Sequence, residues 1–270
     1  MDIFSLPALQ ESAVGKSIEK ALHHAAEQNR GWVGVTESSA GTRWLEKGSL
    51  RHFPAFKVKT VGTLGAGDVF HGIFALGLAE GNTKENSVCW AAAAGATLST
   101  HLGNGIAQML PKTDNPILGQ LAEDRFSASF IADGFHQQPH VLGVYLRAKQ
   151  SIRTILVTDG TAGSASLPGS YSVGPIGIER QPEGMVYIHG TRILAGSSAT
   201  LSGCLANVIN WYGTPFDEAI RWASEQPRRL IGLPESLLVG KPKSQVVWKM
   251  ETQKPVVERV HFGNWNLENL

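Results

Sequence analysis

The pattern of apolar and polar positions predicts a helix near residue 70. From Val69 to Leu78 the apolar residues recur mostly at helical spacing, and Gly81 follows as a natural stop signal. Immediately before this stretch stands a turn at 65–67 that reads Gly-Ala-Gly. We therefore expect a glycine turn at the N-terminus of a helix.

A second pattern begins after a turn-rich, charged break at 112–126 and predicts alternating strands and helices. Residues 129–134 are expected to form a strand that ends in a polar turn, and residues 141–148 a helix. Residues 154–157 form a β-branched run that ends in Thr-Asp-Gly. Strand, helix and strand in this order predict a parallel βαβ unit, with chemistry at the carboxyl ends of the strands. The expected fold class is therefore α/β.

The composition is that of a folded protein. The chain has 270 residues, of which 42% are apolar and 17% charged, and its net charge of +1 gives no reason to expect nucleic acid or a membrane surface as partner. Cys89 and Cys204 lie far apart without metal-ligand spacing, so we expect free thiols in a reducing compartment. The sequence has neither a run of 18 apolar residues nor a basic, signal-like start. We expect no membrane span and a cytoplasmic location.

The glycine turn carries the first candidate chemistry. Gly65 and Gly67 let the backbone approach a ligand closely, and the N–H groups at a helix N-terminus attract anions such as phosphate. Asp68 opens the helix, either as an N-terminal cap or as a base that takes a proton from an attacking hydroxyl. On the motif alone, capping is the more frequent role.

The segment Thr63–Gly72 resembles the second signature of the PfkB (ribokinase-like) carbohydrate kinase family, which reads Asp-Thr-x-Gly-Ala-Gly-Asp before an aromatic-rich helix. Strand-like segments at 32–36 and 51–56 precede it. An alanine-rich stretch at 88–100 and the loop 101–105 follow, in the order of the family. The resemblance covers roughly residues 1–120 and implies a partial ribokinase-like αβα layer.

This resemblance implies a role for single residues. Asp68 would activate a sugar hydroxyl, and Mg-ATP would supply the phosphoryl group. The anion hole would consist of Gly65, Ala66 and Gly67, and the nucleotide would be bound by Thr36, Gly41, Gly103 and Asn104.

Two positions depart from the family pattern. Gly62 stands where the family has a supporting aspartate, and Ser38 stands where it has a glycine. The family also carries a sugar-binding half before this region. We therefore expect phosphoryl transfer to be impaired, unless homo-oligomerisation completes the sugar site.

Residues 124–265 resemble N-acetylglucosamine-6-phosphate deacetylase, of the amidohydrolase superfamily. The matching segments, in the order of that family, are Ile131–His136, Val157–Gly160, Ile193–Ser197, Pro215–Ala219, Ala223–Gly232, Val239–Pro242 and Val256–Gly263. The resemblance implies a partial (β/α) barrel followed by a few strands of a small β domain. We therefore expect two domains, a kinase-like one at 1–120 and a deacetylase-like one at 124–270.

The deacetylase family performs metal-assisted amide hydrolysis. By resemblance, Asp159 orients the attacking water and protonates the leaving amine, His136 contacts the substrate, and a backbone clamp is formed by Leu194, Ala195 and Gly196. A divalent metal such as Zn or Fe would bind Asp159 in an incomplete site, because the other ligands come from earlier strands of the family. Asp159 as a turn cap is the less favoured alternative. For His136, an ordinary packed histidine is equally compatible with the sequence.

The chain therefore has the sequence pattern of a fusion, which one deletion spanning two neighbouring genes would produce, with the junction near 112–126. Three functional classes compete: kinase-like phosphoryl transfer with nucleotide and sugar or sugar-phosphate partners, deacetylation, and a non-catalytic remnant. The sequence ranks the kinase-like function first, because Asp68 and its glycine turn are intact. It identifies neither the sugar nor the metal, and it leaves the oligomeric state open.

Overall fold

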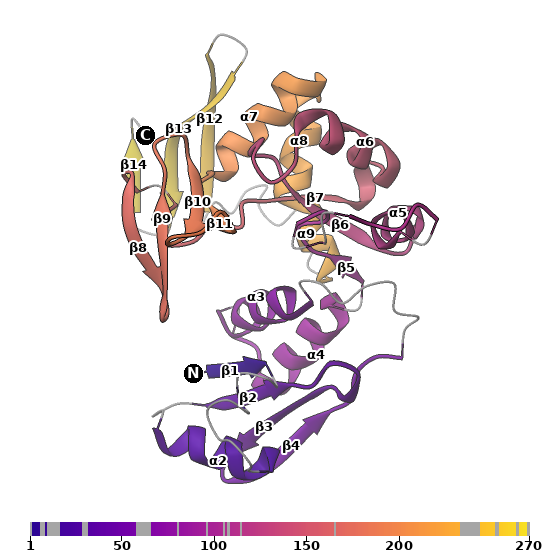
Figure 1. Ribbon diagram of the computed structural model, residues 1–270, viewed down its shortest axis with the longest axis vertical. Helices are drawn as coiled ribbons and strands as arrows, with labels where there is room; N and C mark the ends of the chain where they lie inside the picture. The colour runs from indigo at the N-terminus through magenta and orange to yellow at the C-terminus, as the bar shows by residue number, and fades with distance from the viewer. Residues whose placement is uncertain are drawn as a thin grey trace. The chain divides into compact units, whose positions relative to one another are not determined.

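The computed structural model describes residues 2–5, 9, 17–28, 32–57, 66–79, 81–95, 97–104, 106, 109–113, 115–164, 166–232, 244–251, 254–262 and 265–268. The chain divides into two compact units, Met1–Thr100 and His101–Leu270 (Figure 1). Each unit combines helices with strands, so the predicted α/β class is confirmed at this level.

The first unit contains a four-stranded sheet in the order β1-β2-β3-β4. Strands β1 and β2 are parallel, and the other neighbours are antiparallel. The strands are β1 (Asp2–Ser5), β2 (Val33–Thr36), β3 (Thr42–Glu46) and β4 (Ser49–Phe53). The other elements are α2 (Ile18–Gln28), η1 (Ser38–Ala40), α3 (Ala66–Ala79), α4 (Lys84–Gly95) and β5 (Leu98–Ser99).

Helices cover both faces of this sheet. Leu22 of α2 packs in one apolar cluster with Val33 and Val35 of β2. Trp44 pairs with Gly34, so its side chain lies on the opposite face, where it clusters with Phe74 of α3. Alternation of side chains along the strands thus builds two separate apolar layers.

Helix α3 confirms the helix predicted near residue 70. It begins at Ala66, within the Gly-Ala-Gly turn, and ends at Ala79. Gly81 follows with φ of +82° and donates its backbone N–H to Leu78. Glycine takes this left-handed conformation without steric penalty, which is why it ends the helix.

The second unit is built on the predicted βαβ unit. Strands β6 (Ser127–Ile131) and β7 (Thr154–Val157) are parallel and are joined by α6 (Pro139–Lys149) and η2 (Ser151–Arg153). Phe130, Leu142, Leu156 and Leu205 belong to one buried cluster of this unit. The remaining helices are α5 (Pro116–Ala122), α7 (Leu201–Tyr212), α8 (Phe216–Ala223) and α9 (Glu225–Leu230).

Two antiparallel sheets complete the second unit. One has the order β11-β10-β9-β8 and the other the order β12-β13-β14. Their strands are β8 (Gly169–Val173), β9 (Ile176–Arg180), β10 (Met185–Ile188), β11 (Leu194–Ser197), β12 (Ser244–Glu251), β13 (Lys254–Phe262) and β14 (Trp265–Glu268). The part of the chain that the structure describes forms no closed barrel. Nor does it contain a helix long and apolar enough to cross a membrane.

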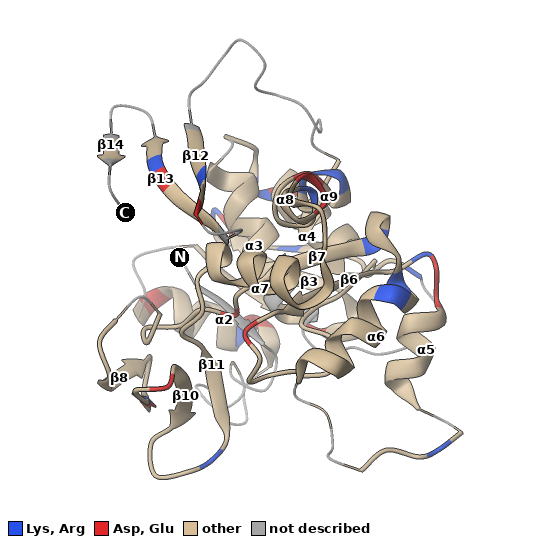
Figure 2. Cartoon of the chain, turned by 90° about the horizontal axis from the view of Figure 1, so that it is seen from above, with Lys and Arg blue, Asp and Glu red and all other residues tan. Residues whose placement is uncertain are grey.

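Charged residues of both signs occur on the same helices, for example on α8 and α9 (Figure 2). On α8, Asp217 accepts a hydrogen bond from Arg221 one turn later. On α9, Glu225 stands in the first turn and Arg228 in the last. A surface ion pair such as that of Asp217 and Arg221 contributes little to stability.

One charged side chain of the second unit is buried. Lys149 is 3% exposed, and its ammonium donates to the backbone carbonyls of Gln120 and Glu123 at 2.8 and 2.7 Å, at the end of α5. Burial lowers the pKa of Lys149 to about 8, although the nearby carboxylates of Asp124 and Glu123 act in the opposite direction. The two carbonyl acceptors hold the ammonium in place of water.

We predict that Lys149 makes stability rise with pH. Its pKa is lower in the folded than in the unfolded chain, so the unfolded chain binds more protons between about pH 8 and about pH 10.5. Relative to Lys149→Met, the wild type should gain about 2 kcal/mol in free energy of unfolding between pH 8 and pH 10. Urea denaturation followed by circular dichroism measures this difference. Lys249→Met is the control. A hydrogen bond to Glu251 raises the pKa of Lys249, so comparison with this variant should show no such gain in wild-type stability with rising pH. An unchanged difference across this range would contradict the prediction.

Candidate functional site

The carboxyl ends of β6 and β7 lie side by side. Their register pairs Ile131 with Val157, so the residues that follow each strand emerge at the same edge. Asp133 follows β6 and Asp159 follows β7. Parallel pairing therefore brings two carboxylates that are distant in the sequence to one place.

Asp133 organises the turn after β6. Its Oδ1 accepts hydrogen bonds from the backbone N–H groups of Phe135 and His136 at 2.9 and 3.0 Å, and its Oδ2 lies 2.7 Å from Nδ1 of the His136 ring. The two side chains are 5% and 1% exposed. Burial acts to raise the pKa of Asp133, but the hydrogen bonds from His136 and Phe135 outweigh it and hold this pKa below its ordinary value.

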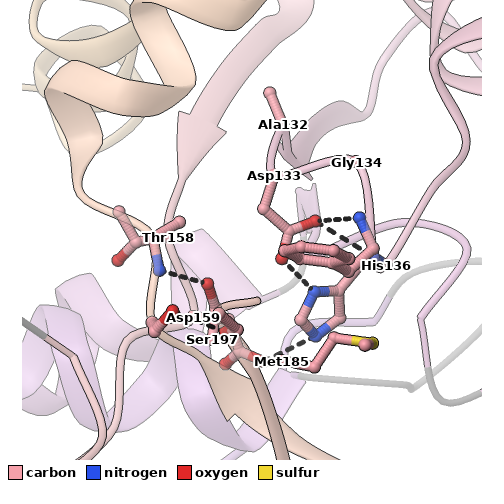
Figure 3. A network of polar contacts seen from close by, with 12 residues as sticks. Ala132, Asp133, Gly134, His136, Thr158, Asp159, Met185 and Ser197 are labelled. Atoms are coloured by element: carbon pink, nitrogen blue, oxygen red, sulfur yellow. Dashed lines mark hydrogen bonds and ion pairs between the residues drawn. The ribbon is translucent and has the colours of Figure 1, made fainter. Parts of the chain in front are cut away.

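His136 links this turn to Asp159. Figure 3 shows the imidazole between Asp133 and Asp159, with Nδ1 toward the first and Nε2 toward the second. The Nε2 atom lies 3.9 Å from Oδ2 of Asp159 and is buried without a hydrogen-bond partner among the described residues. Asp159 is 33% exposed, so it forms the solvent side of the network.

The backbone of Asp159 is held by β11. Its φ is +54°, a left-handed value that aspartate tolerates better than most residues. The carbonyl of Asp159 accepts a hydrogen bond from Ser197 at 2.7 Å, and Gly160 forms a parallel bridge with Ser197. The hydroxyl of Thr161 donates to the carbonyl of Ala195 at 3.2 Å. Leu194, Ala195 and Gly196, all in β11, are thereby placed beside the segment that carries Asp159.

Helix α7 contacts the carboxyl ends of β6 and β7 and helps to fix them. Asn207 donates to the carbonyl of Ala132, directly before Asp133, at 2.8 Å. The thiol of Cys204 lies 3.9 Å from the carbonyl of Val157, and burial raises the pKa of this thiol to about 11. Both cysteines are free, as predicted, and Cys204 is an inert packing residue.

A cavity of about 270 Å³ adjoins this network. Asp133 contributes to its wall, together with the first turn of α7 and the turn between β9 and β10. Its lining includes Phe135, Arg180, Glu183, Gly184, Ser198, Ala199, Thr200, Gly203 and Asn207. Nε of Arg180 is buried there without a hydrogen-bond partner among the described residues.

The kinase-like candidate residues are described only in part. Ala66 and Gly67 begin α3, and the ring of His71 lies 2.6 Å from the carbonyl of Gly67. Gly65 and the side chain of Asp68 lie outside the described residues.

The predicted nucleotide residues fall into two pairs. Thr36 ends β2, and Gly41, with φ of +98°, follows η1; Glu37 between them donates its N–H to the carbonyl of Gly41. A side chain at Gly41 would collide with the backbone carbonyl of Phe53, so only glycine fits there. Gly103 and Asn104 form a turn in the second unit.

The described residues do not fit a catalytic metal centre. A catalytic zinc site needs three protein ligands, and no group of three histidine, cysteine or acidic side chains with suitable geometry occurs in the described part of the chain. His136 and Asp159 supply two donors at most, because Asp133 is occupied by hydrogen bonds from the turn.

Two residues of this network had no assigned role in the sequence analysis. Asp133 stood there only within a polar turn and within the matching segment Ile131–His136, although its position three residues before His136 is typical of an aspartate that accepts hydrogen bonds from the following backbone. Ser197 closes β11 against Asp159, a contact that only the three-dimensional arrangement reveals.

Comparisons with known proteins separate the two halves of the chain. The family model described as pfkB family carbohydrate kinase matches residues 8–111. N-acetylglucosamine-6-phosphate deacetylase from Homo sapiens is 34% identical over 151 residues, which are 53% of this chain and 36% of that protein. The chain joins a PfkB-family segment to a deacetylase-related segment. This composite chain spans little more than a third of the length of the deacetylases that it matches.

Solved structures of both kinds of protein are similar to the chain. The deacetylase from Mycobacterium smegmatis, a mutant in complex with N-acetyl-D-glucosamine-6-phosphate, matches with 25% identity and a TM-score of 0.55. The match covers 72% of the composite chain and 53% of that protein. Ribokinase from Thermotoga maritima is 34% identical over 35% of this chain and 33% of its own, with a TM-score of 0.33.

We predict that Gly196→Ala destabilises the second unit. Gly196 has φ of +77°, and a Cβ there would lie 2.2 Å from Cγ2 of Thr161 and 2.7 Å from the carbonyl oxygen of Asp159. The free energy of unfolding should fall by about 2–3 kcal/mol, because β11 must move away from Asp159. Urea denaturation measures the loss. Gly190→Ala is a matched control, since Gly190 has φ of +74° and open space around its Cβ position. Equal losses in both variants would show that β11 does not constrain Asp159.

Proposed function

We propose that the second unit binds an N-acetylated amino-sugar 6-phosphate at the edge formed by His136, Asp159 and β11. In this proposal, the carboxylate of Asp159 accepts hydrogen bonds from the acetamide N–H or a hydroxyl of the ligand. The backbone of Leu194–Gly196 supplies further polar contacts along the sugar. His136 lies behind Asp159, with its buried Nε2 directed toward the Asp159 carboxylate, and acts on the ligand through that carboxylate.

The observation that carries this proposal is the convergence of three separate segments on one edge. The turn after β6 supplies His136, the turn after β7 supplies Asp159 3.9 Å away, and β11 is hydrogen-bonded to the latter. All three segments lie in the deacetylase-related part of the chain. The cavity lined by Asp133 adjoins this network, and its wall contains Arg180, whose positive charge suits an anionic group, together with Glu183.

Binding, rather than amide hydrolysis, is the function that the described residues support. Deacetylases of this family use a divalent metal to generate the attacking hydroxide. The described residues provide too few donors for such a metal. The proposal therefore includes no hydrolytic step.

We also propose an architecture for each of the two segments, the PfkB-family one and the deacetylase-related one. We assign residues 1–120 to a partial ribokinase-like αβα layer. The helices on both faces of the first sheet support this for residues 1–100, whereas residues 101–120 belong to the second compact unit. Residues 124–270 are assigned to a partial amidohydrolase barrel with strands of a small β domain, supported by the parallel β6–α6–β7 unit and the antiparallel sheets.

We predict that the full chain binds N-acetylglucosamine 6-phosphate, and that Asp159→Asn weakens this binding about tenfold by removing a charged hydrogen-bond acceptor. Glucose 6-phosphate lacks the acetamide and should bind at least about tenfold more weakly. Isothermal titration calorimetry in the presence of a chelator measures these affinities without a contribution from metal.

Asp217→Asn is the matched control, because Asp217 is exposed on α8 and paired with Arg221. Its affinity should equal that of the wild type. If the folded chain binds neither sugar, or both equally, the proposal is wrong. Release of acetate on addition of Zn²⁺ or Fe²⁺ would instead show that the chain retains hydrolytic activity.

A second candidate is nucleotide binding in the PfkB-family segment. The observation that favours it is the start of α3 at Ala66, which puts the backbone N–H groups of Ala66 and Gly67 in the first turn of a 14-residue helix, where anions are favoured. By family, the nucleotide would be Mg-ATP and Asp68 the base of a sugar kinase. Phosphoryl transfer itself stays a proposal that depends on residues outside the described part.

We predict that saturating Mg-ATP raises the melting temperature of the first unit by several degrees, since a ligand at 100 times its Kd stabilises the folded state by about 2.7 kcal/mol. Differential scanning calorimetry of the full chain resolves this shift from the unfolding of the second unit. Asp68→Asn should retain the shift, because a base for the sugar hydroxyl is not needed to bind nucleotide. Absence of any shift in the folded wild type would exclude this candidate.

A further inference from the structure

We infer that Asp133 is a positioning residue that keeps a proton on Nδ1 of His136 and so leaves Nε2 as the ring nitrogen without a proton, directed toward Asp159. The inference rests on the proposed function for its consequence, which is ligand affinity. The hydrogen-bond geometry that carries it belongs to the protein alone.

The two oxygens of Asp133 have separate tasks. Oδ1 accepts the backbone N–H groups of Phe135 and His136, which fixes the orientation of the carboxylate. Oδ2 is then the atom that faces Nδ1 of His136, at 2.7 Å. An ionised carboxylate only accepts hydrogen bonds, so Nδ1 must carry a hydrogen whether the ring is neutral or charged.

Burial leaves Asp133 and His136 without alternative hydrogen-bond partners from the solvent. The His136 side chain is 1% exposed and that of Asp133 is 5% exposed, so water cannot replace either partner. The other ring nitrogen, Nε2, makes no hydrogen bond to the described residues and points toward Asp159 at 3.9 Å, a separation too long for a hydrogen bond. The orientation of the ring therefore depends on Asp133 rather than on Asp159.

With an asparagine at position 133, the same geometry places the proton of the neutral His136 ring on Nε2 instead of Nδ1. The two backbone N–H groups still require an acceptor, so the side-chain carbonyl of asparagine takes the place of Oδ1. Its NH₂ group then faces Nδ1 of His136. Because an amide NH₂ only donates, Nδ1 must become the acceptor and the hydrogen must move to Nε2.

The test is the protonation of the two ring nitrogens of His136, measured by ¹⁵N NMR of the full chain at a pH between 7 and 8, with His136→Gln used to assign the signals. We expect Nδ1 to be protonated in the wild type and unprotonated in Asp133→Asn. Asp159→Asn, in the same network, should leave Nδ1 protonated. A wild-type Nδ1 without a proton, or an unchanged Nδ1 in Asp133→Asn, would overturn the inference.

Two further measurements separate this inference from the proposed function. Asp133→Asn should bind N-acetylglucosamine 6-phosphate about three- to tenfold more weakly than the wild type, the effect of one misplaced hydrogen bond. If the wild type binds no sugar phosphate but the proton moves as expected, the positioning role stands and the proposed function fails. If Asp133→Asn does not fold, the wild-type and Asp159→Asn spectra still decide whether Asp133 holds the Nδ1 proton.

Discussion

The parallel pairing of β6 with β7 is the constraint on which the candidate site depends. Ladder hydrogen bonds hold Ile131 level with Val157, and the buried cluster around Phe130 and Leu156 prevents the strands from slipping. A shift by one residue would turn these side chains to the other face of the sheet. Every polar contact of the site, from the turn at Asp133 to the bridge at Gly160, is built on that register.

The regular elements around the site were predictable because their signals are local. Helix α3 follows from apolar spacing and a terminal glycine, and the β6–α6–β7 unit from two apolar runs separated by a helical stretch. Strands β8–β11 carried no comparable signal. They are short and interrupted by glycines, and several of their residues are exposed, so a clear alternation of buried and exposed positions does not arise.

The candidate site divides in the same way. His136, Asp159 and the segment Leu194–Gly196 were named from resemblance, and the structure places them along one edge. Asp133 was not named, because its importance lies in which neighbours its two oxygens contact. The first unit shows the opposite situation. The sequence motif around Asp68 is specific, but the side chain that would do its chemistry lies outside the described residues. Sequence motif and geometry thus favour different halves of the chain.

Strand β11 has a consequence for the order of folding. The hydrogen bond from the Ser197 N–H to the Asp159 carbonyl closes a long loop that contains β8, β9 and β10. The entropic cost of closing a loop increases with its length. The hairpins within that loop join neighbouring strands, and such local contacts form in microseconds. We infer that the antiparallel sheet β8–β11 folds first and brings β11 to the end of β7. The edge that carries Asp159 and β11 is then completed after the βαβ unit on which it rests.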